Sequence, residues 1–320
     1  MKKIYYEKSH GLKKDSKFAV IPLFFLVFVL IIISVTFLSV HDAAKESVNA
    51  SEITAPTATI FPTIHDDRLK QTVENALRGT TGSYGVVVKN LDSGEHYEFN
   101  EHVSYNSASL YKLWVMAVAY QQIEEGKLSE STVLSEDLQI LNKQFGIPTD
   151  DSAPSIGNVA FTVGDALYKM ITVSDNNAAL LLTEKIRLSS ITSFLADNKF
   201  EETVINRNTI LPTTTPHDVA LFFEKIYRGE MGNKESTEKM LSLLKAQQLN
   251  SKIPRLLPAD IIIAHKTGEL DDYTHDAGLI LDKRGDFLVV VMSKSGKPDQ
   301  AATRIANISN AIYTHYILGK

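Results

Sequence analysis

At the centre of this chain lies the segment Tyr105-Asn106-Ser107-Ala108-Ser109-Leu110-Tyr111-Lys112, followed directly by the apolar run Leu113-Trp114-Val115-Met116-Ala117-Val118-Ala119. The apolar run contains neither Gly nor Pro, which predicts a buried helix. Ser109 and Lys112 fall at its start, and residues three apart face the same side of a helix. A serine needs an adjacent base to act as a nucleophile at neutral pH, and a buried lysine can be neutral. We therefore interpret Ser109 and Lys112 as a candidate nucleophile and base, although such a pair also occurs by chance.

Composition sets broad limits on the function. The chain has 320 residues, of which 22% are charged and 44% hydrophobic, as in ordinary globular proteins. There is no cysteine, which excludes disulfides, thiol catalysis and lipid attachment through a thiol. The net charge is −5, and because residues 1–17 contribute +4, the rest of the chain carries −9, which argues against nucleic acid as a partner. The nine histidines show no spacing typical of a metal site, so we expect neither a metal nor another cofactor.

The N-terminal region predicts a membrane anchor. Residues 18–40 contain no charge and as a helix would span about 34 Å, enough to cross the hydrocarbon core of a bilayer. Residues 1–17 carry an excess of lysine, which predicts a cytoplasmic tail and an extracellular location for the rest of the chain. A cleaved signal peptide is the alternative, because Val48-Asn49-Ala50 resembles a cleavage site. We favour an anchor that stays attached, and hence a protein of the cell membrane.

After the anchor, the chain divides into a linker and one domain. Residues 41–64 are rich in Ser, Thr, Ala and Pro, which is typical of a linker, and residues 65–320 form the domain. The predicted strands lie near both ends of the domain, at Tyr84–Lys89, His96–Phe99, Ile261–His265, Ala277–Leu281 and Phe287–Met292. The middle is helical, and Gln300–Leu318 is a closing helix. This pattern predicts an α/β sandwich, in which an antiparallel sheet built from both termini carries helices on its faces.

Two further motifs extend the serine–lysine pair. Ser174-Asp175-Asn176 lies at a break between two helical runs, and Lys266-Thr267-Gly268 lies at the end of a predicted strand. In this order after Ser-x-x-Lys, they match the three signatures of penicillin-recognising serine enzymes. The chain resembles class A β-lactamases and their DD-peptidase relatives over essentially all of residues 65–320. The resemblance implies a β-lactamase/transpeptidase-like fold and an active-site serine hydrolase for amide bonds.

The resemblance also implies catalytic roles for four residues. Ser109 would attack the amide carbonyl and become acylated, and Lys112 would hold or accept its proton. Ser174 would relay a proton to the leaving nitrogen. Lys266 would lie nearby and keep the Ser174 hydroxyl acidic. The acyl donor would be a β-lactam or a peptidoglycan stem peptide.

Further residues would bind the substrate. The resemblance implies that Asn176 binds the side-chain amide of the substrate and that Thr267 grips its carboxylate. Beside Gly268, the backbone N–H of Glu269 would join that of the nucleophilic serine in an oxyanion hole, where two donors meet the developing negative charge.

Two candidates remain open at this point. Lys252 lies six residues before Pro258, where some relatives carry an arginine that binds the substrate carboxylate, but a solvated surface lysine is the alternative. His275 follows Lys266-Thr267-Gly268 on the next strand, near the expected mouth of the site. It would either face the substrate or be an ordinary strand residue.

The chain departs from the family pattern in one segment. A class A β-lactamase uses a glutamate on its Ω-loop to activate the water that releases the acyl group. Here the spacing from Ser174 to Pro216 is shorter than in the family, and Thr203–Pro212 contains no carboxylate. Glu201 and Glu202 precede this segment, and we interpret them as solvated turn residues.

The missing glutamate separates three hypotheses. Acylation needs only residues that are present, whereas hydrolysis of a bulky penicilloyl group lacks its usual base. We therefore favour a DD-peptidase that turns over β-lactams slowly. A true β-lactamase on the same fold is the second hypothesis, and a penicillin-binding sensor or scaffold without turnover is the third. The sequence does not predict an oligomeric state.

Overall fold

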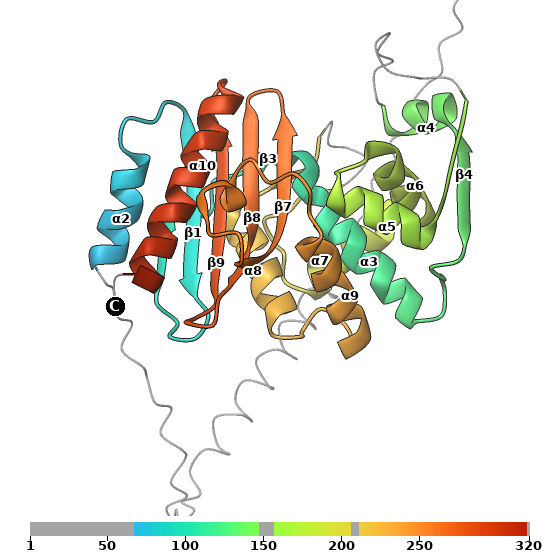
Figure 1. The fold of residues 1–320 in the computed structure, drawn as a ribbon. Coiled ribbons are helices and arrows are strands. Elements are labelled where there is room, and N and C mark those ends of the chain that lie inside the picture. Colours follow the sequence, from blue (N-terminus) through green and yellow to red (C-terminus); the bar gives the residue numbers. More distant parts are fainter. Residues whose placement is uncertain (1–66, 147–156, 206–210, 319–320) are drawn as a thin grey trace, which may run out of the picture. The chain divides into compact units, whose positions relative to one another are not determined.

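The computed structural model describes residues 67–146, 157–205 and 211–318 (Figure 1). The predicted anchor at 18–40, the tail before it and the linker after it lie outside these residues, so they stay predictions. Among the helices that the structure describes, none combines the length and the apolar character needed to span a bilayer.

One antiparallel sheet organises the domain, with its five strands in the order β2-β1-β9-β8-β7 (Figure 1). The strands are β1 (Ser83–Asn90), β2 (His96–Phe99), β7 (Ile262–Leu270), β8 (Tyr273–Leu281) and β9 (Phe287–Lys294). Two of them come from the beginning of the domain and three from its end, and β1 pairs directly with β9. The predicted sheet from both termini is confirmed.

Strand β7 is longer than the sequence predicts. We expected the strand to end at His265, with the Lys-Thr-Gly motif beyond it. Instead β7 continues to Leu270, and Lys266 pairs with Ala277 while Gly268 pairs with His275 of β8. The predicted end of the strand is wrong. The polar residues of the motif interrupt the apolar pattern in the sequence, but in the structure they are buried within the sheet.

The two faces of the sheet belong to different hydrophobic cores. Helices α2 (Asp67–Leu77) and α10 (Pro298–Tyr313) cover one face. In β9, every second residue from Phe287 to Val291 packs in this core, whereas the residues between them and Met292 belong to the larger core on the other side. Burial on both faces explains why β9 reads as an almost continuous apolar run. The predicted closing helix is α10, followed by a π-helical turn at Thr314–Leu318.

The larger core is mostly helical. Its helices are α3 (Lys112–Glu124), α5 (Val163–Thr172), α6 (Asn176–Ile186), α7 (Leu188–Asp197), α8 (Pro216–Tyr227) and α9 (Lys234–Lys245). Smaller elements are β3 (Tyr105–Asn106), the 3₁₀ turn η1 (Ala108–Tyr111), β4 (Val133–Asp137), α4 (Leu138–Phe145), β5 (Asn158–Thr162), β6 (Thr213–Thr214) and the 3₁₀ turn η2 (Ile253–Leu256).

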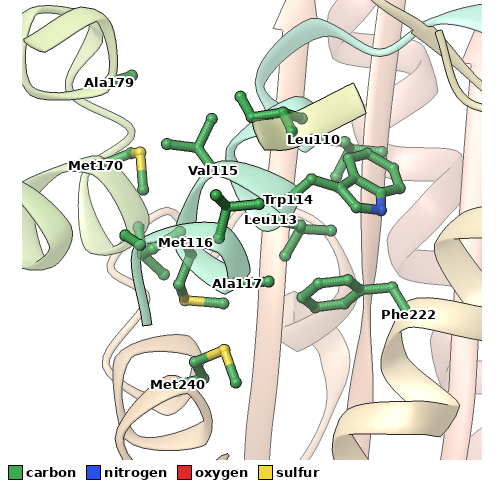
Figure 2. Packing of buried hydrophobic residues seen from close by; sticks show 14 of the residues in the cluster. Leu110, Leu113, Trp114, Val115, Met116, Ala117, Met170, Ala179, Phe222 and Met240 are labelled. Carbon is green, nitrogen blue, oxygen red and sulfur yellow. The ribbon is translucent and has the colours of Figure 1, made fainter. Parts of the chain in front are cut away.

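Helix α3 is the centre of that core, as the sequence predicts. Every residue from Lys112 to Tyr120 is buried. Figure 2 shows Met170 of α5, Met240 of α9 and Phe222 of α8 around the α3 side chains. Burying a large apolar side chain contributes about 1.5–3 kcal/mol, so a helix that is buried all round is held firmly in place. The residues at its N-terminus are therefore fixed in position.

From the sequence, Thr162 and Thr215 are predicted to cap the starts of two helices, and both starts are confirmed. Thr162 caps α5, where its Oγ1 accepts a hydrogen bond of 3.0 Å from the backbone N–H of Asp165. Thr215 caps α8, where its Oγ1 accepts a 3.2 Å hydrogen bond from the N–H of Asp218, and Pro216 occupies the first helical position. Such caps satisfy N–H groups that have no partner within the helix.

Candidate active site

Ser109 lies in the 3₁₀ turn η1, immediately before α3. The sequence predicts it in the first turn of the long helix, but the structure gives it a separate turn that packs against β7. Ala108, the residue before it, has a φ of +44°, which is unfavourable for a residue with a side chain. The Asn106 side chain holds this backbone by accepting a 2.9 Å hydrogen bond from the N–H of Ala108. The strain before Ser109 is typical of a functional site.

Lys112 is fully buried and binds the Ser-Asp-Asn motif. Its Nζ donates hydrogen bonds to the carbonyl oxygen of Ser174 at 2.6 Å, to Ser174 Oγ at 3.2 Å and to Asn176 Oδ1 at 2.8 Å. Within the described residues it forms no hydrogen bond with the Ser109 hydroxyl, so the expected direct contact is not made. Burial lowers the pKa of Lys112 to about 7, although the charge of Asp175 opposes the shift. At neutral pH this amine can therefore accept a proton.

Ser174 occupies the break between α5 and α6 in a left-handed conformation, with a φ of +60°. Asp175 fixes the break, because its carboxylate caps α6 through a 2.9 Å hydrogen bond from the N–H of Ala178. Lys266 Nζ donates to Ser174 Oγ at 3.0 Å, the same oxygen that accepts from Lys112. One hydroxyl thus lies between two lysine nitrogens.

Lys266 is the second buried lysine. Its Nζ also donates to the carbonyl oxygen of Thr267 at 2.9 Å. Burial, followed by the charge of Lys112, holds the pKa of Lys266 well below its usual range. Since like charges this close disfavour double protonation, the two lysines can exchange a proton through the Ser174 hydroxyl.

Gly268 brings β7 against the turn that carries Ser109. A Cβ on Gly268 would lie 3.2 Å from the carbonyl oxygen of Ser107 and 3.3 Å from Ala108 Cβ. Such contacts are tighter than ordinary packing, so any side chain here would push the strand from the turn. Because Gly268 precedes Glu269, this close approach brings together the two backbone segments expected to form the oxyanion hole.

Lys252 is a buried residue, not a solvated surface lysine. It precedes η2, is 1% exposed and forms an ion pair of 2.5 Å with Glu269, whose side chain is 61% exposed. The buried carboxylate of Asp276 holds η2 by accepting a 2.9 Å hydrogen bond from the N–H of Ile253. A third cation therefore faces β7 beside the Lys-Thr-Gly motif, with a carboxylate already against it.

His275 lies in the protein interior and not at the expected mouth of the site. Its Nε2 donates to the carbonyl oxygen of Asn106 at 2.8 Å, and its Nδ1 accepts a 3.1 Å hydrogen bond from the N–H of Ser293. Burial lowers the pKa of His275 to about 4, so the ring is neutral at physiological pH. Its side chain holds β3 through the carbonyl oxygen of Asn106. Because the side chain is buried, it does not face a substrate.

Asn106, which connects these parts, was not predicted from the sequence. Its side chain holds Ala108 and its carbonyl oxygen binds His275. An asparagine hydrogen-bonding two residues ahead is a recognised local pattern, and it lies within the segment quoted first above. The link to His275 crosses the fold and has no local signal.

The loop side of the site is short. The backbone groups of Val204 and Thr213 exchange hydrogen bonds of 2.9 and 3.0 Å, which close the segment where the family carries its Ω-loop, while 206–210 lie outside the described residues. Glu202 is not the solvated residue we expected, because its Oε2 accepts a 2.6 Å hydrogen bond from the Thr215 hydroxyl. Among the described residues, no carboxylate forms a hydrogen bond with Ser109, Lys112 or Ser174.

This fold, with a Ser-x-x-Lys turn, a Ser-Asp-Asn break and a Lys-Thr-Gly strand meeting at one edge of the sheet, defines a penicillin-recognising serine hydrolase. The family model described as the Beta-lactamase enzyme family matches residues 68–316. The chain belongs to this family, and it is a serine hydrolase that acts on amide bonds.

Curated relatives and solved structures agree with this assignment. A β-lactamase of Bacteroides uniformis is 24% identical over 284 residues, covering 80% of this chain and 94% of its own. Beta-lactamase VEB-1 of Pseudomonas aeruginosa is 21% identical over 283 residues, covering 82% and 94%. Among solved structures, PBP-A has a TM-score of 0.69 at 22% identity, covering 78% of this chain and 96% of its own. The TLA-1 extended-spectrum β-lactamase has a TM-score of 0.68 at 21% identity, covering 78% and 98%.

Proposed function

We propose that this protein is a DD-peptidase-like serine hydrolase, which is acylated at Ser109 by D-Ala-D-Ala-type stem peptides and by β-lactams and releases β-lactam acyl groups slowly. The observation that carries this proposal is a difference between the groups available for acylation and those available for deacylation. The groups that acylation requires surround Ser174, whereas no described carboxylate binds Ser109, Lys112 or Ser174. The sequence of the shortened loop offers none either.

In the acylation step, Ser109 Oγ attacks the amide carbonyl carbon. The new C–O bond forms as neutral Lys112 takes the hydroxyl proton, directly or through Ser174. Collapse of the tetrahedral intermediate breaks the C–N bond, and the Ser174 hydroxyl passes a proton to the leaving nitrogen. Lys112 and Lys266 both lie within hydrogen-bond distance of Ser174 Oγ, so either can restore its proton. No metal or cofactor is needed to balance this step.

Substrate binding follows from the same geometry. The backbone N–H groups of Ser109 and Glu269 form the oxyanion hole, and Asn176 binds the amide next to the scissile bond. Thr267 and Lys266 bind the substrate carboxylate, with Lys252 adding positive charge. A carboxylate at the D-alanine end of a stem peptide and one on a penicillin present the same anion to these residues.

Stem peptides and β-lactams differ in the deacylation step. In a stem peptide the D-alanine product departs, which leaves space for a water or an acceptor amine. In a β-lactam the leaving nitrogen stays tethered to the acyl group, so hydrolysis depends on a base that activates water. PBP-A, which shares the fold, has been solved as a variant in an acyl-enzyme complex with penicillin G. That complex supports the expectation of a long-lived penicilloyl enzyme.

For the cellular location we propose a single-pass membrane protein, anchored by residues 18–40 with residues 1–17 in the cytoplasm. The uncharged anchor and the lysine-rich tail support this orientation. The linker at 41–64 then lets the catalytic domain reach substrate outside the membrane. Peptidoglycan stem peptides occur on that side.

A true β-lactamase is the second candidate, since the curated relatives above carry that name. The test uses the full-length protein in detergent, mixed with a chromogenic cephalosporin and, separately, with a D-Ala-D-Ala stem peptide. We expect a burst of one equivalent, slow steady hydrolysis and measurable release of D-alanine. Rapid steady turnover would instead identify a β-lactamase, and a burst without D-alanine release would identify a binder. Ser109→Ala is the control that abolishes the burst.

A further inference from the structure

A second group of reactive side chains lies outside the serine site. His102 comes from the loop between β2 and β3, Glu202 from the turn after α7, and His217 from the first turn of α8. Each offers one ligand atom, and these atoms all lie within 4.8 Å of one another. Their positions are far apart in the sequence, so the spacing of the histidines gave no sign of this cluster.

The contacts within the cluster are close. His102 Nδ1 is 2.7 Å from Glu202 Oε1, and His217 Nδ1 is 3.9 Å from Glu202 Oε2. The two imidazole rings have centroids 4.9 Å apart with an angle of 38° between their planes. The Glu202 carboxylate therefore lies between the two imidazoles, and His217 Nδ1 is also 3.3 Å from Asp218 Oδ1.

The backbones that carry these side chains are fastened to one another. The N–H of His217 donates to the carbonyl oxygen of Glu101 at 2.9 Å, which joins α8 to the His102 loop. The N–H of Glu202 donates to the buried carboxylate of Asp218 at 3.0 Å. The fold thus brings the three donor side chains together.

We propose that His102, Glu202 and His217 bind a first-row divalent transition-metal ion, for which Zn²⁺ is the best match. Two imidazoles and one carboxylate are donors that zinc prefers, whereas Mg²⁺ and Ca²⁺ select oxygen ligands. Ligand atoms around a tetrahedral zinc are about 3.4 Å apart. The side chains are 58%, 32% and 43% exposed, in the order given, which leaves room for water at the remaining positions.

The bound ion would connect three segments that lead into the Ser109 region. His102 precedes β3, and Glu202 and His217 flank the segment that contains β6, the strand that pairs with β3. The N–H of Ser107 also donates to the carbonyl oxygen of Pro212 at 2.9 Å. An ion that binds only the folded state stabilises it by mass action, so zinc would raise the melting temperature. This role is structural and does not depend on the proposed peptidase activity.

The test is a calorimetric titration of the full-length protein in detergent with ZnCl₂, after treatment with a chelator and its removal. We expect one zinc per chain, a higher Tm and no displacement by excess Mg²⁺. His102→Ala or His217→Ala should each weaken binding by at least about tenfold, since even the partners that orient metal ligands contribute that much. His96→Ala, a histidine of β2 outside the cluster, should bind zinc as the parent does.

Glu202→Gln guards against loss of folding, because the amide can still accept the Thr215 hydrogen bond while the charge is gone. It should keep penicillin labelling of Ser109 and lose zinc affinity. Ser109→Ala should lose labelling and keep zinc binding, which separates this inference from the proposed function. No zinc binding by the parent, unchanged binding by the His102→Ala/His217→Ala double variant, or displacement by Mg²⁺ would overturn the assignment.

Discussion

The strand side of the active site, formed by α3, the start of α6 and β7, contrasts with the loop side closed by Val204 and Thr213. On the strand side, two buried lysines meet at one serine hydroxyl, and each has a hydrogen bond to it. On the loop side, the carboxylate of Glu202 forms hydrogen bonds with Thr215 and His102. Under the proposed function, acylation and deacylation would depend on these two separate parts of the fold, so one could be lost while the other stays complete.

The largest expected effect concerns the base on the strand side. Lys112→Met should slow acylation of Ser109 by about 10²–10⁴-fold, the usual contribution of a general base. Stopped-flow measurement of the burst with a chromogenic cephalosporin gives this rate. Lys89→Met is the matched control, because Lys89 pairs with Glu224 away from Ser174 and should leave the rate unchanged. A Lys112→Met rate near that of the parent would transfer the role of base to another group.

The next prediction concerns pH. Only the neutral amine of Lys112 accepts a proton, and its pKa of about 7 means that the neutral form is lost below that pH. The acylation rate should therefore rise with pH up to about 7 and then level off, falling about tenfold per pH unit on the acid side. A profile of burst rates from acid to alkaline pH measures this. If the rate stayed flat through neutral pH, the neutral lysine would not be the base.

His275 tests the support behind the strand side. His275→Leu leaves the carbonyl oxygen of Asn106 and the N–H of Ser293 without their partner, which should cost about 1–3 kcal/mol of unfolding free energy. Denaturant unfolding measures the loss, and the acylation rate should fall with it as the turn before Ser109 loosens. His315→Leu serves as the comparison, because His315 contacts Glu95 and Tyr316 instead of the segment before Ser109. Full stability of His275→Leu would show that the two hydrogen bonds contribute little.

The smallest expected effect concerns substrate charge. Glu269 pairs with Lys252 where a substrate carboxylate would approach. Glu269→Gln should speed acylation by penicillin G by about fivefold, because like charges about 4 Å apart in water repel by ~1 kcal/mol. A penicillin methyl ester, which has no carboxylate charge, should gain nothing, and Glu269→Asp should behave as the parent. Slower acylation by penicillin G would mean that Glu269 holds Lys252 in its productive position.

The elements that form the strand side could be predicted from the sequence because their signals are local. Each motif is a short run of neighbouring residues, and helix caps such as Thr162 and Thr215 depend on neighbours three residues away. The end of β7 was misplaced because buried Lys266 and Thr267 look like surface residues in a hydropathy pattern. Hydropathy patterns assume that buried residues are apolar, and polar groups in a buried site do not follow this rule.

The loop side and the histidines were predicted poorly for a different reason. Glu202 reads as a solvated turn residue until Thr215 and His102 are brought to it by the fold. His275 lies on the strand after the Lys-Thr-Gly motif, as predicted. Its side chain is buried against Asn106, which belongs to a distant segment of the sequence. Contacts between residues that are distant in the sequence leave no periodic pattern from which they could be predicted.

The pairing of β1 with β9 has a consequence for how the chain folds. Ser83 lies opposite Lys294, so this contact joins residues separated by most of the domain. The central strands of the sheet cannot be completed until the last part of the chain has been synthesised. A topology rich in such distant contacts folds slowly, since the entropy of closing the loop is lost before the pairing is gained. Each helix of the middle part closes its own hydrogen bonds between neighbouring residues, so we expect these helices to begin to form before the sheet is complete.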